Sequence, residues 1–240
     1  MSTATFLVIH GSRDPRPGLE LTELLRQLRS SCPAALIEGG MLEATEISLA
    51  EQIQQFSDQA QICGYPAINV FPLFLLPGIH VCEDVPAAVK TAQARSPLPI
   101  TLLPYLGQQP GLMPLLQSIL KANQAWVFLG HGSRRPEAMA WIDHLAGELG
   151  AIPAYWTKPE SLKAAIEQWV SQEITEMRIF PYLLFAGKLL ELITQQVQDL
   201  NQDYPQLKLH LTDCLRPGPE LVNLVQDGLG FSETLVLSSN

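Results

Sequence analysis

The sequence predicts an α/β protein made of two similar domains, each a parallel sheet flanked by helices, with a cleft between them. Two observations support this prediction. An apolar, strand-like run that leads into His-Gly-Ser-Arg occurs twice, at 6–13 and at 126–134. Within each copy, β-rich segments alternate with segments of helical periodicity, which is the order that winds helices around a parallel sheet. We therefore expect one domain over residues 1–121 and a second over residues 122–240.

Further matches support an internal duplication. The segment 71–78, Phe-Pro-Leu-Phe-Leu-Leu-Pro-Gly, is echoed at 180–187 by Phe-Pro-Tyr-Leu-Leu-Phe-Ala-Gly. A third match pairs Leu106, Pro110 and Leu112 with Leu215, Pro219 and Leu221. Three matches in the same order are more than chance would give, so we interpret the second half as a shortened copy of the first.

Strand-like and helix-like segments follow one another in the same order in both copies. The strand candidates are 6–9, 35–42, 67–71 and 99–103 in the first copy and 126–129, 152–156, 177–180 and 207–211 in the second. Apolar stripes at helical spacing lie between them, formed by Leu21, Leu24, Leu25 and Leu28 and by Leu162, Ala165, Ile166, Trp169 and Val170. This spacing predicts amphipathic helices that bury one face.

Composition limits the classes of partner. The 240 residues include 15 Lys and Arg against 24 Asp and Glu, a net charge of −9, which disfavours binding to nucleic acid. The longest apolar run, 70–79, contains two prolines and a glycine and is too short to cross a membrane. Because the sequence begins without a secretory signal and its four cysteines form no Cys-x-x-Cys pair, we expect a cytoplasmic protein.

Candidate metal ligands follow three strands of the first copy. In open α/β sheets, ligands bind beyond the carboxyl ends of the strands. His10 follows the first strand, Glu43 the second and His80 the third. Two imidazoles and a carboxylate suit Fe²⁺, Co²⁺, Ni²⁺ or Zn²⁺. The residues alone leave two alternatives open, because His10 could merely shape its turn and Glu43 could favour the N-terminus of the next helix.

The motifs resemble those of a known family. Both His-Gly-Ser loops and the segment 71–86, of the form Phe-Pro-x-Phe-Leu-x-x-Gly-x-His-x-x-x-Asp-x-Pro, are similar to those of the class II tetrapyrrole chelatases, specifically the duplicated sirohydrochlorin chelatases. The resemblance implies a macrocycle bound between two domains and metal insertion without ATP or any cofactor beyond the substrate metal. It also implies that His10, His80 and Glu43 are the catalytic, metal-handling residues. One departure is Ile47, which stands where the family's glutamate motif has proline.

The second copy lacks most of these residues. Aligning Gly187 with Gly78 puts Leu189 in the place of His80, and aligning the serines near the next helix puts Trp156 opposite Glu43. We therefore expect one active site, built on the first domain, and a degenerate second domain. His131, which matches His10, either contacts the substrate or is retained only as a turn residue.

Carboxylates surround the sirohydrochlorin ring, so cations are expected near the site. The substrate-binding candidates are Ser12, Arg13, Arg16, His131, Ser133, Arg134, Arg135 and Lys188. The alternative is that the basic residues are solvated surface charges.

The sequence disfavours two other classes of enzyme. A serine hydrolase is disfavoured because no Gly-x-Ser-x-Gly elbow surrounds Ser12 or Ser133, and a nucleotide-binding enzyme because there is no Walker A run or Gly-x-Gly-x-x-Gly after the first strand. A non-catalytic carrier of metal or tetrapyrrole stays open. We favour Fe²⁺ and siroheme formation, with cobalt for cobalamin as the alternative. We also favour a monomer, because two fused halves remove the need for a homodimer without forbidding one.

Overall fold

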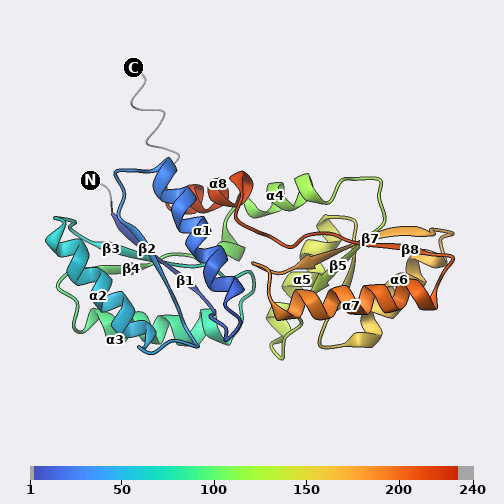
Figure 1. Ribbon diagram of the computed structural model, residues 1–240, viewed down its shortest axis with the longest axis horizontal. Helices are drawn as coiled ribbons and strands as arrows, with labels where there is room; N and C mark the ends of the chain where they lie inside the picture. The colour runs from blue at the N-terminus through green and yellow to red at the C-terminus, as the bar shows by residue number, and fades with distance from the viewer. Residues whose placement is uncertain (1–2, 232–240) are drawn as a thin grey trace, which may run out of the picture. The chain divides into compact units, whose positions relative to one another are not determined.

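Two four-stranded sheets form the framework of the computed structural model, which describes residues 3–231 (Figure 1). The first has the strand order β2-β1-β3-β4 and the second the order β6-β5-β7-β8, with all neighbours parallel. The strands are β1 (Ala4–Ile9), β2 (Ile37–Met41), β3 (Ile68–Pro72), β4 (Ile100–Leu102), β5 (Trp126–Gly130), β6 (Ile152–Tyr155), β7 (Glu176–Tyr182) and β8 (Lys208–Leu211). The two sheets have the same topology, since each strand of the second takes the place of the corresponding strand of the first, which supports the duplication. The predicted fold class is confirmed.

Helices connect the strands in both halves. They are α1 (Arg16–Ser31), α2 (Leu49–Ile62), a π-helical turn η1 (His80–Asp84), α3 (Val85–Gln93), a 3₁₀ turn η2 (Leu106–Gln108), α4 (Leu112–Ile119), α5 (Pro136–Glu148), α6 (Pro159–Val170), α7 (Lys188–Asp203) and α8 (Pro219–Gly228). Each parallel strand pair therefore has a helical crossover, as parallel pairing requires.

The first sheet is buried on both faces. All six residues of β1 are buried, as expected for a strand inside a parallel sheet. Phe6 and Val8 face a core that α2 and α3 complete, and Phe6 packs on Phe56. On the other face, Gly39 of β2 lies against Leu21 and Leu25 of α1. The predicted leucine stripe of α1 is thus confirmed as its buried face.

The second sheet repeats this arrangement. Val127 and Leu129 of β5 share a core with buried residues of α6 and α7, while Ile142 of α5 packs against Gly130 on the other face. The predicted stripe of α6 is confirmed in its first part but wrong at Val170, which is 42% exposed. Val170 is the last residue of α6.

By contacts, the described residues group into two units. One unit contains the described residues up to Leu112 and those from Pro217 onward, and the other contains Met113–Arg216. The sheets follow the expected halves, but α8 belongs to the first unit. There α8 contacts α1, beside which it lies in Figure 1, and Gly228 approaches Phe71 of β3. The physical reason is that α8 covers apolar surface of the first sheet, as its four buried aliphatic side chains show.

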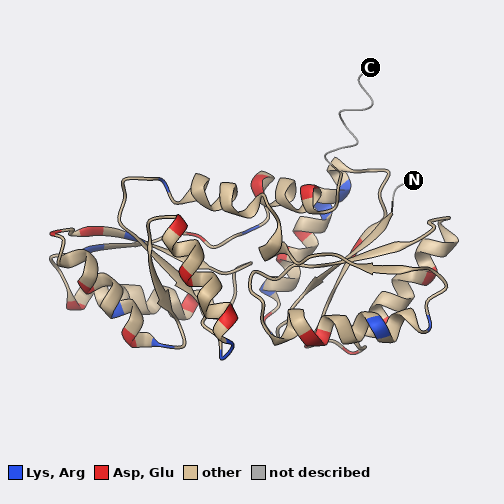
Figure 2. Cartoon of the chain, turned by 180° about the vertical axis from the view of Figure 1, so that it is seen from behind, with Lys and Arg blue, Asp and Glu red and all other residues tan. Residues whose placement is uncertain are grey.

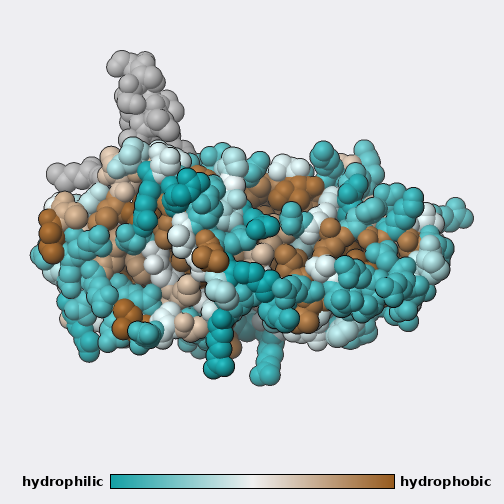
Figure 3. All heavy atoms as spheres, viewed as in Figure 1, coloured by the Kyte–Doolittle hydropathy of each residue, from teal (hydrophilic) through white to brown (hydrophobic). Residues whose placement is uncertain are grey.

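The charged residues are distributed over both units. Figure 2 shows lysines and arginines scattered among acidic residues, and the face in Figure 3 is largely hydrophilic with apolar patches between polar side chains. Within residues 3–231, no helix has the length and apolar character that crossing a bilayer demands.

Candidate metal centre

His10 and Glu43 are held together by their backbones. His10 follows β1 directly, and its carbonyl accepts the backbone N–H of Glu43 at 2.9 Å. The next residue, Gly11, has φ +89°, and a Cβ added to it would lie 2.1 Å from the Glu43 carbonyl oxygen. Only glycine tolerates both the left-handed backbone and this close approach. The loop after β2 therefore packs directly against the loop after β1.

Glu43 does not cap the helix that follows it. The N-terminus of α2 has a capping box, in which Ser48 Oγ accepts the Glu51 N–H and the Glu51 carboxylate accepts the Ser48 N–H. Hydrogen bonds from the Ser48 side chain and backbone lower the pKa of Glu51. Ser48 and Glu51 supply this cap without Glu43. The Glu43 residue lies exposed, two residues after the end of β2. The helix-terminus alternative for Glu43 is not supported.

His80 reaches the same place from the other neighbour of β1. It is the first residue of η1, in the connection that follows β3. Its Nδ1 lies 2.8 Å from Oδ2 of Asp84, the last residue of the same turn. The ring of Phe74 lies alongside, with centroids 6.5 Å apart.

The three predicted residues come together. The Nε2 atoms of His10 and His80 are 2.9 Å apart, and their rings are perpendicular. One ligand atom from each of His10, His80 and Glu43 lies within 4.8 Å of the other two. His10 and Glu43 are exposed and His80 is half-buried, so an ion could reach the cluster from solvent.

The hydrogen bonds define which nitrogens are available. Nδ1 of His10 bonds to the Gly11 carbonyl at 2.8 Å, and Nδ1 of His80 bonds to the Asp84 carboxylate. A carbonyl or carboxylate only accepts, so each neutral ring must carry its proton on Nδ1. With both rings neutral, the two Nε2 lone pairs face each other across 2.9 Å, and a proton or a metal ion between them would offset their repulsion.

The separation suits a single metal ion. Two nitrogens 2.9 Å apart, each about 2.1 Å from one ion, subtend about 90° at that ion. This is the angle between neighbouring ligands of an octahedral centre. A carboxylate within reach adds negative charge and an oxygen ligand, and such a mixed nitrogen and oxygen set suits the borderline divalent metals.

The second unit retains the turn without the ligands. Gly132 has φ +88°, and Nδ1 of His131 bonds to the Gly132 carbonyl, just as His10 bonds to Gly11. The His131 carbonyl accepts the N–H of Thr157 at 3.0 Å. Thr157, and not Trp156, therefore stands in the place of Glu43.

The alignment that favoured Trp156 failed for a structural reason. It treated Ser161 as the equivalent of the cap residue Ser48, but Ser161 lies inside the first turn of α6 and its Oγ accepts the Tyr155 N–H. Leu189, the residue expected in the place of His80, packs against the second core. Among the described residues, His10, Glu43 and His80 are the one group of three or more potential metal ligands.

The serines of the two loops have structural partners. Ser12 Oγ accepts the N–H of Asp14 and Ser133 Oγ accepts the N–H of Arg135, both at 3.1 Å. The two side chains close equivalent turns, a role that the sequence analysis did not assign to them. Whether they also contact a substrate stays a prediction.

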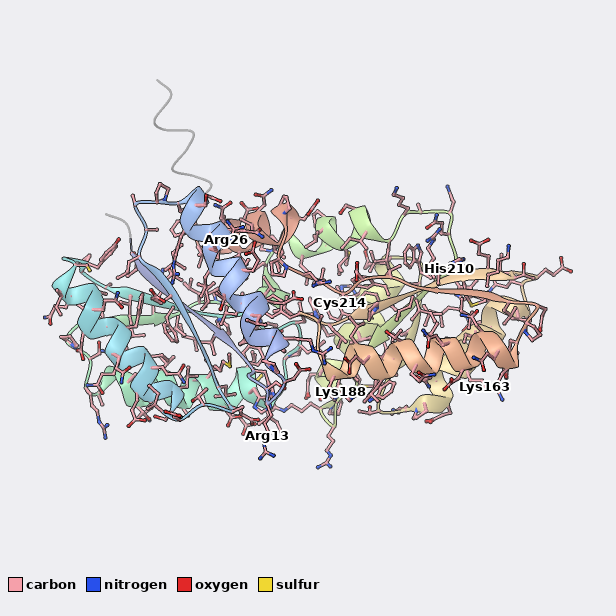
Figure 4. All side chains as sticks on the ribbon, viewed as in Figure 1. Arg13, Arg26, Lys163, Lys188, His210 and Cys214 are labelled. Carbon is pink, nitrogen blue, oxygen red and sulfur yellow. The ribbon has the colours of Figure 1, made fainter. Side chains whose placement is uncertain are left out.

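The predicted cations differ in their surroundings. Arg16 Nε donates to Asp14 Oδ1 at 2.9 Å, and Lys188 forms an ion pair with Glu191 on the first turn of α7. Arg13 and Arg134 are exposed and Arg135 is half-buried. Figure 4 shows Arg13 projecting away from the ribbon and Lys188 at the start of α7. Arg13 is therefore the candidate of the first loop that is most open to an anionic ligand.

Asp84 is the residue at this site that the sequence analysis missed. It was part of the motif at 71–86 but was given no role. The available signal was its spacing of four from His80, which places two side chains on the same side of a helical turn.

Comparison with known proteins agrees with this geometry. The model of the CbiX family matches residues 4–123 and again residues 125–230. The chain belongs to the CbiX family. The duplicated match agrees with the two sheets, and the resemblance to class II tetrapyrrole chelatases is confirmed.

Individual relatives of this CbiX-family chain align along most of its length. It is 26% identical to a sirohydrochlorin ferrochelatase of Bacillus subtilis over 225 residues, covering 87% of this chain and 84% of the relative. It is 21% identical to a sirohydrochlorin cobaltochelatase of Priestia megaterium, covering 93% and 78%. The fold matches the crystal structure of the sirohydrochlorin chelatase SirB from Bacillus subtilis subspecies spizizenii in complex with cobalt, with a TM-score of 0.76, 24% identity and coverage of 96% and 94%.

Proposed function

We propose that this CbiX-family chain inserts a divalent metal, Fe²⁺ in preference, into sirohydrochlorin without ATP, as a step of siroheme formation. The observation that supports the proposal most strongly is the pair of Nε2 atoms 2.9 Å apart, in the connections that follow the adjacent strands β1 and β3, with the Glu43 carboxylate beside them. The ferrochelatase of Bacillus subtilis supports the reaction type.

The metal is a substrate in this reaction. His10 and His80 present it through Nε2, while Glu43 offsets part of its charge. Because the cluster lies at an exposed edge, the incoming ion can exchange water for these ligands step by step. Imidazole suits this task because it is a good ligand for these metals when it is neutral.

Metal insertion also displaces protons. The free macrocycle carries two inner N–H protons, which must leave as the divalent ion enters. In this proposal the imidazoles and the carboxylate of the cluster are the bases that serve the reacting nitrogens. As the ion leaves the cluster for the macrocycle, the freed groups accept those protons.

Apolar side chains near the cluster suit a flat ring. Ile79, directly before His80, is 51% exposed, and Ile47, in the loop after Glu43, is 39% exposed. Burying such side chains against a macrocycle face removes apolar surface from water, which favours binding. Arg13, in the loop after β1, then pairs with a peripheral carboxylate.

Cobalt is the second candidate for the metal. It is supported by the cobaltochelatase of Priestia megaterium, and nitrogen and oxygen sites generally bind Co²⁺ more tightly than Fe²⁺. With cobalt, the same insertion would serve cobalamin formation.

The test is anaerobic incubation of the chain with sirohydrochlorin and Fe²⁺, Co²⁺ or Ni²⁺ in turn, followed by absorption spectroscopy. We expect many metallations per chain with Fe²⁺ and no requirement for ATP. Faster turnover with Co²⁺ than with Fe²⁺ would favour the cobalt alternative. Stoichiometric binding without turnover for any ion would contradict catalysis and indicate a carrier.

A further inference from the structure

We propose that Asp84 is a positioning residue that fixes the His80 ring for metal binding, an inference that rests on the proposed function of this site. Asp84 Oδ2 accepts the Nδ1 proton of His80 at 2.8 Å. A neutral imidazole can carry its proton on either nitrogen, and only the Nδ1–H form leaves the Nε2 lone pair facing His10. The contact selects the form that the metal cluster needs.

The backbone holds this pair at a fixed separation. His80 and Asp84 are the first and last residues of η1, and the Val85 N–H closes the turn on the His80 carbonyl. The two side chains are 34% and 45% exposed, so neither fills the apolar core. A hydrogen bond to a carboxylate between partly exposed side chains contributes only modestly to stability. The contact is therefore better explained by ring orientation than by stabilisation of the fold.

The second unit gives an internal comparison. With Gly187 matched to Gly78, Leu189 replaces His80 and packs against the second core. The π-turn adds one residue to the first copy, because the buried Val85 and Val89 of α3 correspond to the buried Ile193 and Val197 of α7. Leu192, which is 44% exposed, therefore replaces Asp84. Both polar residues are thus replaced in the copy whose described residues form no metal cluster. This joint replacement indicates that His80 and Asp84 act as one unit.

The two imidazoles differ in their second partner. His10 Nδ1 bonds to the Gly11 carbonyl, a neutral acceptor, whereas His80 Nδ1 bonds to a carboxylate, which is the stronger acceptor. Removing the carboxylate would free the His80 ring to rotate or to move its proton to Nε2. The His10 ring would keep its own partner, so the effect should be confined to His80.

The experiment compares Asp84→Ala, Asp84→Asn and Glu83→Gln in the full chain. Glu83→Gln is the matched control, because it removes the same charge one residue away in the same turn. Co²⁺ affinity is measured by titration without tetrapyrrole, and ¹⁵N NMR of the imidazoles reports which His80 nitrogen carries the proton. The His80 signals are assigned by their loss in His80→Ala.

We expect Asp84→Ala to weaken Co²⁺ binding about 10- to 100-fold and to shift His80 towards the Nε2–H form. Asp84→Asn keeps an acceptor oxygen and should recover most of the affinity and the Nδ1–H form. Glu83→Gln should leave both readouts unchanged. Unchanged tautomer and affinity in Asp84→Ala would overturn the inference, as would an equal loss in Glu83→Gln, which would indicate a general charge effect.

Sirohydrochlorin metallation is measured separately on the same variants. A wild-type chain that binds Co²⁺ but metallates no sirohydrochlorin would contradict the proposed function. The role of Asp84 in orienting His80 would still be decided by the titration and the NMR spectra.

Discussion

Gly11 and Glu43 approach each other so closely that a Cβ on Gly11 would lie 2.1 Å from the Glu43 carbonyl oxygen. This approach, together with the hydrogen bond from Glu43 to the His10 carbonyl, ties the position of the carboxylate to that of the first imidazole. The geometry of the cluster therefore depends on a residue that has no side chain.

We expect Gly11→Ala to lower the free energy of unfolding and to weaken metal binding. The left-handed backbone costs about 1–2 kcal/mol for an L-residue, and the clash with Glu43 adds about 1–3 kcal/mol. Gly64→Ala is a matched control, since Gly64 has φ +82° with open space around it. It should show the backbone cost alone. Urea unfolding and Co²⁺ titration measure both effects, and equal losses in the two variants would show that the Glu43 contact is unimportant.

His10→Ala and His80→Ala are each expected to abolish metal insertion while the fold is retained. Each variant removes one of the two facing nitrogens. Loss of a residue that only supports a metal ligand can lower metal affinity about 100-fold. Loss of a ligand itself should therefore lower Co²⁺ affinity by more than this. The rings lie outside the apolar cores, so circular dichroism should be unchanged. His210→Ala, which alters a surface histidine paired with Glu176, serves as the control. Full activity in either site variant would reject the assignment.

Glu43→Gln should slow insertion and weaken Co²⁺ binding about tenfold or more, because it removes the negative charge that offsets the ion. Glu46→Gln removes an exposed charge from the same loop and should leave Co²⁺ affinity unchanged. Titration of both variants at one ionic strength separates a ligand effect from a general loss of negative charge. Equal Co²⁺ affinities in the two variants would show that Glu43 does not bind the ion.

Arg13→Gln should raise KM about two- to fivefold with little change in kcat, because an exposed ion pair with a substrate carboxylate contributes modestly to binding. Arg26 on α1 is also exposed but pairs with Glu23, so Arg26→Gln should leave KM unchanged. Steady-state kinetics at increasing salt provide a second check. In wild type, salt should raise KM more than it lowers kcat. A KM that is independent of salt would argue against carboxylate pairing.

Local patterns were sufficient to predict the strands and the cluster. Each predicted strand lies within two residues of an observed one, because short β-rich runs bounded by turn residues leave few alternatives. His10, Glu43 and His80 could be expected at one edge because the carboxyl ends of parallel strands meet there. Their roles in insertion stay predictions.

Other features depend on tertiary contacts that a linear pattern does not contain. The match of Leu112 with Leu221 correctly relates α4 to α8, but it does not say which sheet each helix covers. The equivalence of Thr157 and Glu43 became visible only through the hydrogen bonds to the preceding histidine carbonyls. Asp84 has a partner only once η1 is formed.

The return of α8 to the first unit has a consequence for biosynthesis. The metal cluster lies on residues up to His80, yet α8, which completes the same unit, is synthesised only after the whole second sheet. A chain cut near residue 121 would lack the helix that approaches Phe71 of β3. The two repeats, although related by duplication, therefore exchange a helix across their sequence boundary.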